Sequence, residues 1–433
     1  MNKTPRPDAD IPAELEALMV LIEQSFPLEK RFRHTLPRDV ARLSRLLTFE
    51  RAEREAGYMG QAALLSAYLR YFLPWNVYRL SRILPELPLS LKDGDSLLDL
   101  GSGPLTFPIA LWLCRRELRS LTLEFRCLDH NGRALEAGLV LFRALAGKDA
   151  PWSIKTMRSS LGEKIPGKKA ALVSAIEFYN ELFQHERRSI GEFADKQGGL
   201  LSALADSDGS ILVAEPGIPQ SGAFISALRA ALIRRGRLPC APCVHAEACA
   251  FPGPTAGRRR EKWCHFAFAV EDAPRQLLDL SLAAGLPKDR AVLSFLYAGA
   301  SSAANASYTS VDRPDTGANA SRANTSHLNT DAKASPAGNT KRPDTSCPVR
   351  VISDSFSLEN GRWGRYGCSG QGMVLLSASR RSMDATPSGS LVMALKTPAR
   401  DKKSGALIME MPENLAAPRG VKPFAADKNT RLS

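Results

Sequence analysis

The stretch SLLDLGSGP, residues 96–104, decides the fold of this 433-residue chain. A short apolar run contains Asp99, Gly101 and Gly103 follow it, and a helical stretch, LTFPIALWLCRREL, comes next. Glycines at such a turn let the backbone approach a ligand closely, and the N-terminus of the following helix favours negative or electron-rich groups. The pattern is typical of the first strand–turn–helix unit of a nucleotide-binding sheet.

Further strand-like runs follow this turn. They are LTLEFRCLDHN (121–131), AALVSAIEFYNEL (170–182) and GSILVAEPGIP (209–219). Because strands alternate with helical stretches, the sequence predicts an α/β fold with a parallel, helix-covered sheet. Asp129 ends the second run, where an acid can accept hydrogen bonds from both ribose hydroxyls of a nucleoside cofactor. We therefore predict a cofactor site formed by Asp99, Gly101, Gly103 and Asp129.

The turn also indicates which cofactor binds. Residues 101–106 read GSGPLT and lack the last glycine of the dinucleotide pattern G-x-G-x-x-G. An aspartate two residues before the first glycine instead resembles motif I of class I S-adenosylmethionine-dependent methyltransferases, D/E-x-G-x-G-x-G. Leu105 stands where the third glycine of that motif would fall. The resemblance implies a Rossmann-like class I methyltransferase core and S-adenosylmethionine as the cofactor.

The catalytic half of such an enzyme is not evident. Methyltransferases that act on the amino groups of nucleic-acid bases carry an Asn/Asp-Pro-Pro-aromatic turn after the fourth strand, and cytosine-C5 RNA enzymes carry a Pro-Cys nucleophile there. The corresponding stretch here is IEFYNEL, which has neither. Asn180 and Glu181 either line a substrate site or cap the turn locally. These residues leave open whether the protein is an enzyme, which would be an S-adenosylmethionine-dependent RNA methyltransferase.

Charge points to a polyanionic partner. The chain has 58 Lys and Arg residues against 45 Asp and Glu residues, a net charge of +13. An excess of this kind on a soluble protein favours nucleic acid as the partner. The N-terminus lacks a secretion signal, and no stretch is apolar for long enough to span a bilayer. We expect a cytoplasmic protein without membrane contact, in which structural disulfides are rare.

Composition divides the chain into six segments. One of them, rich in Ser, Ala, Asn and Thr, cannot bury enough apolar surface to fold, so it is predicted to be a disordered insertion between ordered parts. The predicted segments are a helical N-terminal region (1–90), the methyltransferase-like core (91–237), a cysteine-rich metal-binding segment (238–298), the insertion (299–346), a C-terminal β segment (347–382) and a flexible basic tail (383–433).

Half of the eight cysteines lie close together in the sequence. LPCAPCVHAEACAFPG (238–253) and EKWCHFAF give the spacing C-x2-C-x5-C-x14-C. The four residues are Cys240, Cys243, Cys249 and Cys264. In a reducing compartment, clustered thiols indicate zinc or an iron–sulfur cluster. Cys114 and Cys127, in a predicted helix and a predicted strand, are expected to lie in the core.

Four motifs occur in a fixed order: EPGIPQSG from residue 215, APCVHAEAC, WCHF and GRWGRYGCSGQG. Together they resemble the ribosomal small-subunit assembly methyltransferase-like family, whose members occur in mitochondria and bacteria. That family typically reads E-P-G-T-P-x-G, A-P-C-P-H-x-x-x-C-P and W-C-H-F. The match runs from about residue 60 to 380 without the insertion. Val244 and Ala250 replace the two prolines of the second motif, which removes no thiol.

The resemblance implies a [4Fe–4S] cluster on the methyltransferase core. Its ligands would be Cys243, Cys249, Cys264 and, from the later segment, Cys368. Cys240 is then the alternative to Cys368 as the fourth ligand. The alternative metal is zinc, held by a local knuckle of four cysteines. A cluster that includes the later cysteine would tie the C-terminal segment to the sheet, so that metal-binding energy becomes folding energy.

Basic residues flank the thiols, with Trp263 and Phe266 interleaved. They are Arg229, Arg234, Arg235, Arg237, Arg258, Arg259, Arg260 and Lys262. Arginines with aromatic residues suit phosphate contact and base stacking, and the resemblance implies the RNA of the small ribosomal subunit as the polyanion.

Two functions stay open. One is a factor that binds ribosomal RNA and supports assembly of the small subunit and translation, and the other is an active S-adenosylmethionine-dependent rRNA methyltransferase. A radical enzyme is disfavoured, because the spacing C-x3-C-x2-C is absent.

Overall fold

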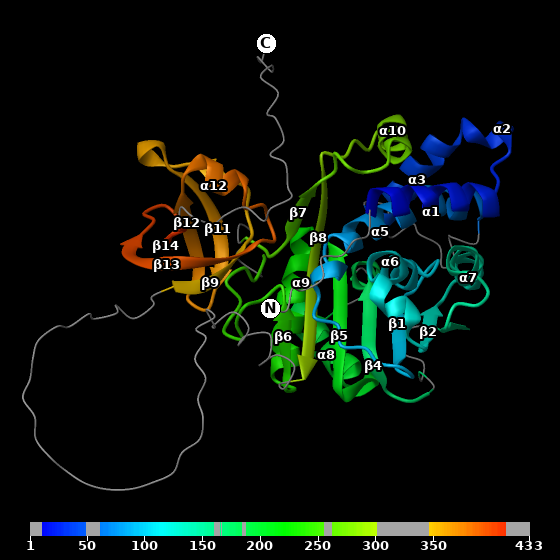
Figure 1. Ribbon diagram of the computed structural model, residues 1–433, viewed down its shortest axis with the longest axis horizontal. Coiled ribbons are helices and arrows are strands. Elements are labelled where there is room, and N and C mark those ends of the chain that lie inside the picture. Colours follow the sequence, from blue (N-terminus) through cyan, green and yellow to red (C-terminus); the bar gives the residue numbers. More distant parts are fainter. Residues whose placement is uncertain are drawn as a thin grey trace, which may run out of the picture.

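The computed structural model describes residues 11–48, 61–159, 165, 167–183, 188–254, 262–300 and 346–412. Figure 1 shows a large sheet covered by helices and, beside it, a smaller body of strands in orange and red. In the described ranges, no helix combines the length and the apolar character needed to cross a membrane. Residues 301–345 of the predicted insertion lie outside these ranges.

The large sheet has eight strands. The first five strands in spatial order are parallel to one another. Strand β8 then pairs antiparallel with β5, and β6 and β7 both pair antiparallel with β8. In spatial order the strands are β3 (Trp152–Arg158), β2 (Leu123–Asp129), β1 (Ser96–Leu100), β4 (Ala170–Ile176), β5 (Ala205–Pro216), β8 (Arg290–Ala300) and β6 (Arg237–Ala241), with β7 (Phe266–Ala269) also on β8. The predicted α/β class is confirmed.

Both faces of this sheet are buried. Leu97 and Leu98 are neighbours on β1 and point to opposite faces, into two separate apolar clusters. Successive side chains of a strand alternate between faces, so an apolar run without alternation marks a strand covered on both sides. The covering helices are α6 (Thr106–Cys114), α7 (Gly132–Ala146), α8 (Ile190–Leu204) and α9 (Pro219–Ile233), with short turns η5 (Arg116–Ser120) and η6 (Tyr179–Glu181). Helix α10 (Arg275–Ala283) packs on the N-terminal helical region instead.

The N-terminal region is helical, and its helices pack on α6 and α7. The sequence predicts a helix broken at Pro74, but the helix runs on from Ala62 to Ser81 through one π-helical turn. Proline lacks the N–H that an α-helix needs there, and Pro74 lies two residues after the end of the wider turn at Phe72. The elements are α1 (Ile11–Ser25), α2 (Lys30–Arg33), α3 (Leu36–Thr48), α4 (Ala62–Ala67), η3 (Tyr68–Phe72), α5 (Leu73–Ser81) and η4 (Leu84–Glu86).

The smaller body is a barrel. Its strands pair in the order β9–β11–β12–β14–β13, and β13 pairs back to β9, which closes the ring. The predicted flexible tail from residue 383 is wrong for residues 383–412, because alternating apolar residues there complete the barrel core. The elements are β9 (Ser346–Val351), β10 (Phe356–Ser357), η7 (Glu359–Gly361), β11 (Trp363–Ser369), β12 (Gly372–Ala378), α12 (Arg380–Asp384), β13 (Leu391–Arg400) and β14 (Leu407–Glu410).

Several contacts fix the barrel to the segment around the cysteines. Arg350 is half-buried and donates from Nε to the Pro242 carbonyl at 2.9 Å. The ammonium of Lys262 lies 3.4 Å from the ring centroid of Tyr366. Ile352 and Cys368 belong to the same apolar cluster as the N-terminal helices and the sheet. The barrel is therefore joined to the core through the cysteine-rich segment.

Candidate functional site

The glycine turn after β1 is built on left-handed backbone. Gly101 and Gly103 have φ of +67° and +52°, and Leu105 has φ of +58°. Leu105 thus takes the conformation that the third glycine of the motif would take, which ordinary residues rarely adopt. Its side chain is fully buried against α7, where a Cβ on Gly138 would stand 2.3 Å from the carbonyl carbon of Pro104. Gly138 therefore permits the close approach of turn and helix.

Asp129 joins the ends of β1 and β2. Its carboxylate accepts the Gly103 N–H at 2.9 Å and the Asn131 N–H at 2.8 Å, one on each oxygen. Each carboxylate oxygen has a second lone pair, so further donors such as ribose hydroxyls can bind. The structure brings this predicted residue directly against the glycine turn.

Asp99 lies beneath the turn. The hydroxyl of Ser102 donates to one of its oxygens at 2.5 Å and that of Ser174 to the other at 2.7 Å. Burial raises the pKa of Asp99 to about 7, although both hydroxyls act in the opposite direction. Its side chain is 1% exposed. Asp99 therefore shapes the turn from inside the sheet rather than presenting its carboxyl at the surface.

Tyr68, from the π-helical turn η3, is a residue that the sequence analysis missed. Its hydroxyl lies 3.9 Å from the position of a Cβ on Gly103 and is hydrogen-bonded to Thr106. Burial raises the pKa of Tyr68 strongly, and the carboxylates of Glu181, Glu177 and Asp129 raise it further. π-Turns occur frequently at functional sites. The helical pattern alone marks Tyr68 as one more core residue, since its acidic neighbours are distant in sequence.

The loop after β4 is held by Glu215 at the end of β5. The backbone N–H groups of Phe178, Tyr179 and Asn180 donate to the Glu215 carboxyl at 3.2, 2.7 and 2.9 Å. Burial raises the pKa of Glu215 to about 8, and the charge of Glu177 adds to this, while the backbone donors oppose it.

The same loop contacts the glycine turn. The ring of Phe178 packs on Gly101, where an added Cβ would stand 2.2 Å from it. The predicted substrate-side residue Asn180 is buried within this loop, and Glu181 contributes to the acidic surroundings of Tyr68. Glu215 therefore fixes the position of the loop relative to the candidate cofactor site.

The four cysteines that the family resemblance implies are close enough for the charge of one thiolate to act on the others. Burial raises the pKa of the Cys264 thiol well above its ordinary value, and neighbouring thiols raise it further. Burial also raises the pKa of Cys368 to about 12, with contributions from two of the same thiols. These neighbours are Cys243, Cys249 and Cys368 for Cys264, and Cys243 and Cys249 for Cys368.

Polar groups also connect these thiols. His245 Nε2 and Cys368 Sγ are 3.2 Å apart, which links the barrel to the segment before β7. Arg229 on α9 donates from Nε to Cys243 Sγ at 3.2 Å and from Nη2 to the His245 carbonyl at 2.6 Å. Its guanidinium lowers the pKa of Cys243 against the larger effect of burial.

The remaining cysteines lie elsewhere. Cys240 is on β6, where its thiol donates to the Leu238 carbonyl and lies near Tyr297. Cys114 and Cys127 are buried in the core, as expected. Across the residues described, no three histidine, cysteine or acidic side chains are arranged to hold a metal ion. The fold thus gathers the four thiols without placing them at ligand distances.

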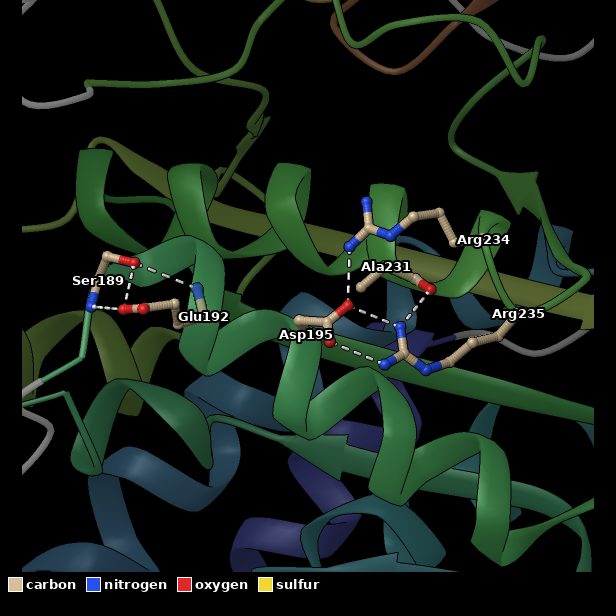
Figure 2. A network of polar contacts seen from close by, with 6 residues as sticks. All are labelled: Ser189, Glu192, Asp195, Ala231, Arg234 and Arg235. Atoms are coloured by element: carbon tan, nitrogen blue, oxygen red, sulfur yellow. Dashed lines mark hydrogen bonds and ion pairs between the residues drawn. The ribbon is translucent and has the colours of Figure 1, made fainter.

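The basic residues near the thiols are largely used inside the fold. The prediction of nucleic-acid contact is wrong for Arg229 and Arg237, which are buried and bonded to neighbouring residues. Figure 2 shows Arg234 and Arg235 converging on Asp195 of α8, with N–O distances of 2.8 Å for both. Positions 258–260 lie outside the described residues.

The aromatic residues next to the thiols are structural too. Trp263 donates to the Gly217 carbonyl at 3.0 Å and packs against Gly222, where an added Cβ would stand 2.6 Å from its ring. Phe266 is fully buried. Trp263 therefore joins the cysteine-rich segment to α9, and Phe266 is not open for base stacking.

Five parallel strands, an antiparallel strand beside them and a glycine turn closed by the acid of the next strand define a class I methyltransferase fold. The family model for the mitochondrial small ribosomal subunit protein Rsm22 matches residues 65–323, more than half of the chain. The chain therefore belongs to the Rsm22 family. No curated protein matches it.

Several solved structures are similar to about half of this chain. A putative methyltransferase from Thermoplasma acidophilum shares 12% identity over 49% of this chain and 70% of its own, with a TM-score of 0.29. The 16S rRNA methyltransferase KamB shares 14% over 48% and 89%, with a TM-score of 0.29. A methyltransferase from Thiobacillus denitrificans in complex with S-adenosylhomocysteine shares 13% over 52% and 91%, with a TM-score of 0.31.

Proposed function

We propose that this methyltransferase-like protein binds S-adenosylmethionine at the glycine turn and acts on the small ribosomal subunit, where it binds rRNA and supports assembly and translation. The observation that carries the cofactor proposal is the contact between Asp129 and the Gly103 N–H. Asp129 is an acid that can accept hydrogen bonds from ribose hydroxyls, and the glycines of the adjoining turn leave room for a ligand. Membership of the Rsm22 family supports the ribosomal part.

The residues divide the work of binding. Asp129 would hold the ribose, the left-handed backbone of Gly101 and Gly103 would let the cofactor approach, and Asp99 would keep the turn in shape from below. S-adenosylmethionine, when bound, supplies an electrophilic methyl group. Tyr68 closes the turn from the N-terminal side, and its hydroxyl stays protonated because burial and neighbouring acids raise its pKa.

An active rRNA methyltransferase is the alternative. The observation in its favour is the acidic group next to the turn, Glu177 and Glu181, whose charges both act on the Tyr68 hydroxyl. Carboxylates at such a place can accept a proton from a substrate as a methyl group is transferred. Transfer of radiolabelled methyl groups to small-subunit RNA would distinguish this alternative from a role in binding alone.

Calorimetry tests the cofactor proposal. Wild-type protein should bind S-adenosylmethionine, and Asp129→Asn should bind at least about tenfold more weakly, because a charged acceptor of hydrogen bonds is lost. Asp149→Asn, at an exposed position, is the matched control and should bind like wild type. Absence of binding by the wild-type protein would contradict the cofactor proposal.

Co-sedimentation tests the ribosomal part independently. Wild-type protein should travel with small ribosomal subunits and not with large ones at physiological salt. Equal binding to both, or to neither, would contradict it whatever calorimetry shows.

We further propose a [4Fe–4S] cluster held by Cys243, Cys249, Cys264 and Cys368. The electrostatic coupling of these four thiols supports the set, and so does the position of Cys240 on β6 beside Tyr297. Thiolates are soft ligands suited to iron–sulfur clusters or to zinc, which stays the alternative metal. Since Cys368 belongs to the barrel, a cluster here would add its binding energy to the docking of the barrel.

Metal analysis after anaerobic purification tests this set. Wild-type protein and Cys240→Ser should both contain iron and sulfide, and Cys368→Ser should contain much less of both, because it lacks one of the four proposed thiolate ligands. Zinc in place of iron, or a loss that follows Cys240 instead of Cys368, would contradict the proposed cluster.

A further inference from the structure

The order in which the barrel strands are connected is not evident from the sequence. In chain order its five ring strands are β9, β11, β12, β13 and β14. Neighbouring strands around the ring are antiparallel except for one parallel pair, β12 with β14, and β13 closes the ring on β9. Helix α12 lies between the third and fourth strands. This is the topology of the oligonucleotide/oligosaccharide-binding (OB) fold, a five-stranded Greek-key barrel.

The face that OB folds most often use is covered here. OB folds bind ligands over their second and third strands and with the turns that join strands one to two and four to five. On β11 and β12, Tyr366, Cys368 and Met373 pack against the core cluster, and Lys262 covers the ring of Tyr366. Of the two turns typical of this fold, the one between β9 and β11 exposes the acids Asp354 and Glu359, whereas the hairpin of β13 and β14 exposes positive charge.

That hairpin is basic. Its exposed cations are Lys396, Arg400, Lys402 and Lys403, which we call the basic hairpin. Two acids lie on the same hairpin, Asp401 and Glu410. The Asp401 carboxylate accepts the Ser404 N–H at 2.8 Å and also the Ser404 hydroxyl, and its pKa is lowered by these bonds. This carboxylate is therefore turned into its own loop.

The turn is also held in one shape. The Asp401 N–H donates to the Ala406 carbonyl at 2.9 Å, and Arg400 Nη1 donates to the Gly405 carbonyl at 2.9 Å. Thr397 Oγ1 reaches across to the Ile408 carbonyl at 2.7 Å. A turn fixed by its own backbone loses little entropy when its cations meet a ligand. The lysines at 402 and 403 are thus displayed on a preformed loop.

We propose that the basic hairpin binds the phosphates of single-stranded RNA. Of the two ligand classes of OB folds, oligonucleotides and oligosaccharides, only the first offers the regularly spaced negative charges that a cluster of lysines and an arginine matches. Contact of this kind gives affinity without reading base sequence. The inference deepens the proposed function, on which it rests for the identity of the RNA in the cell, and it moves the RNA contact from the arginines near the thiols to the barrel.

Fluorescence anisotropy with a labelled single-stranded oligoribonucleotide of mixed sequence tests the proposal on the full chain. The test variant is Lys396→Gln/Lys402→Gln/Lys403→Gln, which leaves Arg400 and its contact with the turn in place. The matched control is Lys148→Gln/Lys169→Gln/Lys196→Gln, which removes the same charge from exposed positions on the core.

The hairpin variant should bind RNA at least about tenfold more weakly than wild type, and the control no more than about twofold. The slope of log affinity against log salt should fall by about 2 in the hairpin variant, since each lost phosphate contact on a single strand contributes about 0.7. Equal losses in both triple variants would show a general effect of net charge and overturn the proposal, as would an unchanged hairpin variant.

Failure here is distinguishable from failure of the proposed function. Co-sedimentation of the wild-type protein with small subunits judges the ribosomal role, and anisotropy with an unrelated oligoribonucleotide judges the hairpin. If the wild-type protein sediments with small subunits but the hairpin variant binds RNA like wild type, the ribosomal role stands and the proposal for the basic hairpin is overturned.

Discussion

Replacing Glu215 by alanine is expected to lower the free energy of unfolding by about 3–5 kcal/mol. The carboxyl group accepts three consecutive backbone N–H groups, and alanine leaves all three without this acceptor in a buried loop. An unsatisfied buried donor costs about 1–3 kcal/mol, and partial relaxation of the loop keeps the total below the full sum. Because Phe178 contacts Gly101, the disordered loop should also weaken S-adenosylmethionine binding.

Chemical denaturation of Glu215→Ala, Glu215→Gln and Glu136→Ala measures this effect. Glutamine keeps one acceptor oxygen but turns its amide N–H₂ toward a backbone donor. The decrease in unfolding free energy for Glu215→Gln should therefore lie between zero and that for Glu215→Ala. Glu136 is exposed on α7, and its replacement should change stability by less than about 0.5 kcal/mol. A Glu215→Ala protein as stable as the Glu136 variant would show that the loop does not depend on this carboxyl group.

Replacing Asp99 by asparagine is expected to change how stability depends on pH. Burial raises the pKa of Asp99 to about 7 in the folded protein, from an ordinary value of 3.8. Between these two values the unfolded chain releases the proton while the folded chain keeps it. Folded protein is therefore favoured at low pH, and this contribution is lost as pH rises through about 4 to 7 and stays lost above that range.

Asparagine removes this titration and keeps the shape of the side chain. The hydroxyls of Ser102 and Ser174 can each donate or accept, so both can bond to an amide. Relative to wild type, the variant should gain about 2–3 kcal/mol of unfolding free energy between pH 5 and pH 8.

Urea unfolding of both proteins at pH 5, 6.5 and 8 measures the difference, with Asp149→Asn as the exposed control. Parallel pH profiles for wild type and Asp99→Asn would mean that the buried carboxyl group ionises as easily in the folded protein as in the unfolded one.

The sequence predicts the parts of the sheet that are apolar and local. The run that contains Asp99 and the run that ends in Asp129 are strands, and their ends meet through the Gly103 N–H. The strand Trp152–Arg158 escapes prediction because it is a sheet edge whose side chains are mostly half-buried or exposed. The barrel strands after residue 383 escape it because polar and basic residues alternate with their few core positions.

The candidate site was predicted where its residues follow one another in the chain. Glu215 belongs to a quoted motif, yet the target of its carboxyl group lies 35 to 37 residues upstream, which no local pattern reveals. Tyr68 comes from a helix whose periodicity explains it as core. The arginines near the thiols illustrate the opposite error, since a basic sequence motif can be consumed by internal contacts, as Arg229 is by Cys243 and the carbonyl of His245.

The contact between His245 and Cys368 joins residues 123 positions apart, and this has a consequence for how the chain is made. At roughly 5–20 residues per second of translation, about 6–25 s pass between the emergence of one partner and the other. During that interval the part of the core cluster that Ile352 and Cys368 complete stays without these residues. Closing a loop of this length then costs about 4 kcal/mol in chain entropy, which the docking contacts must offset. The junction between His245 and Cys368 therefore forms only after a large part of the chain has been made.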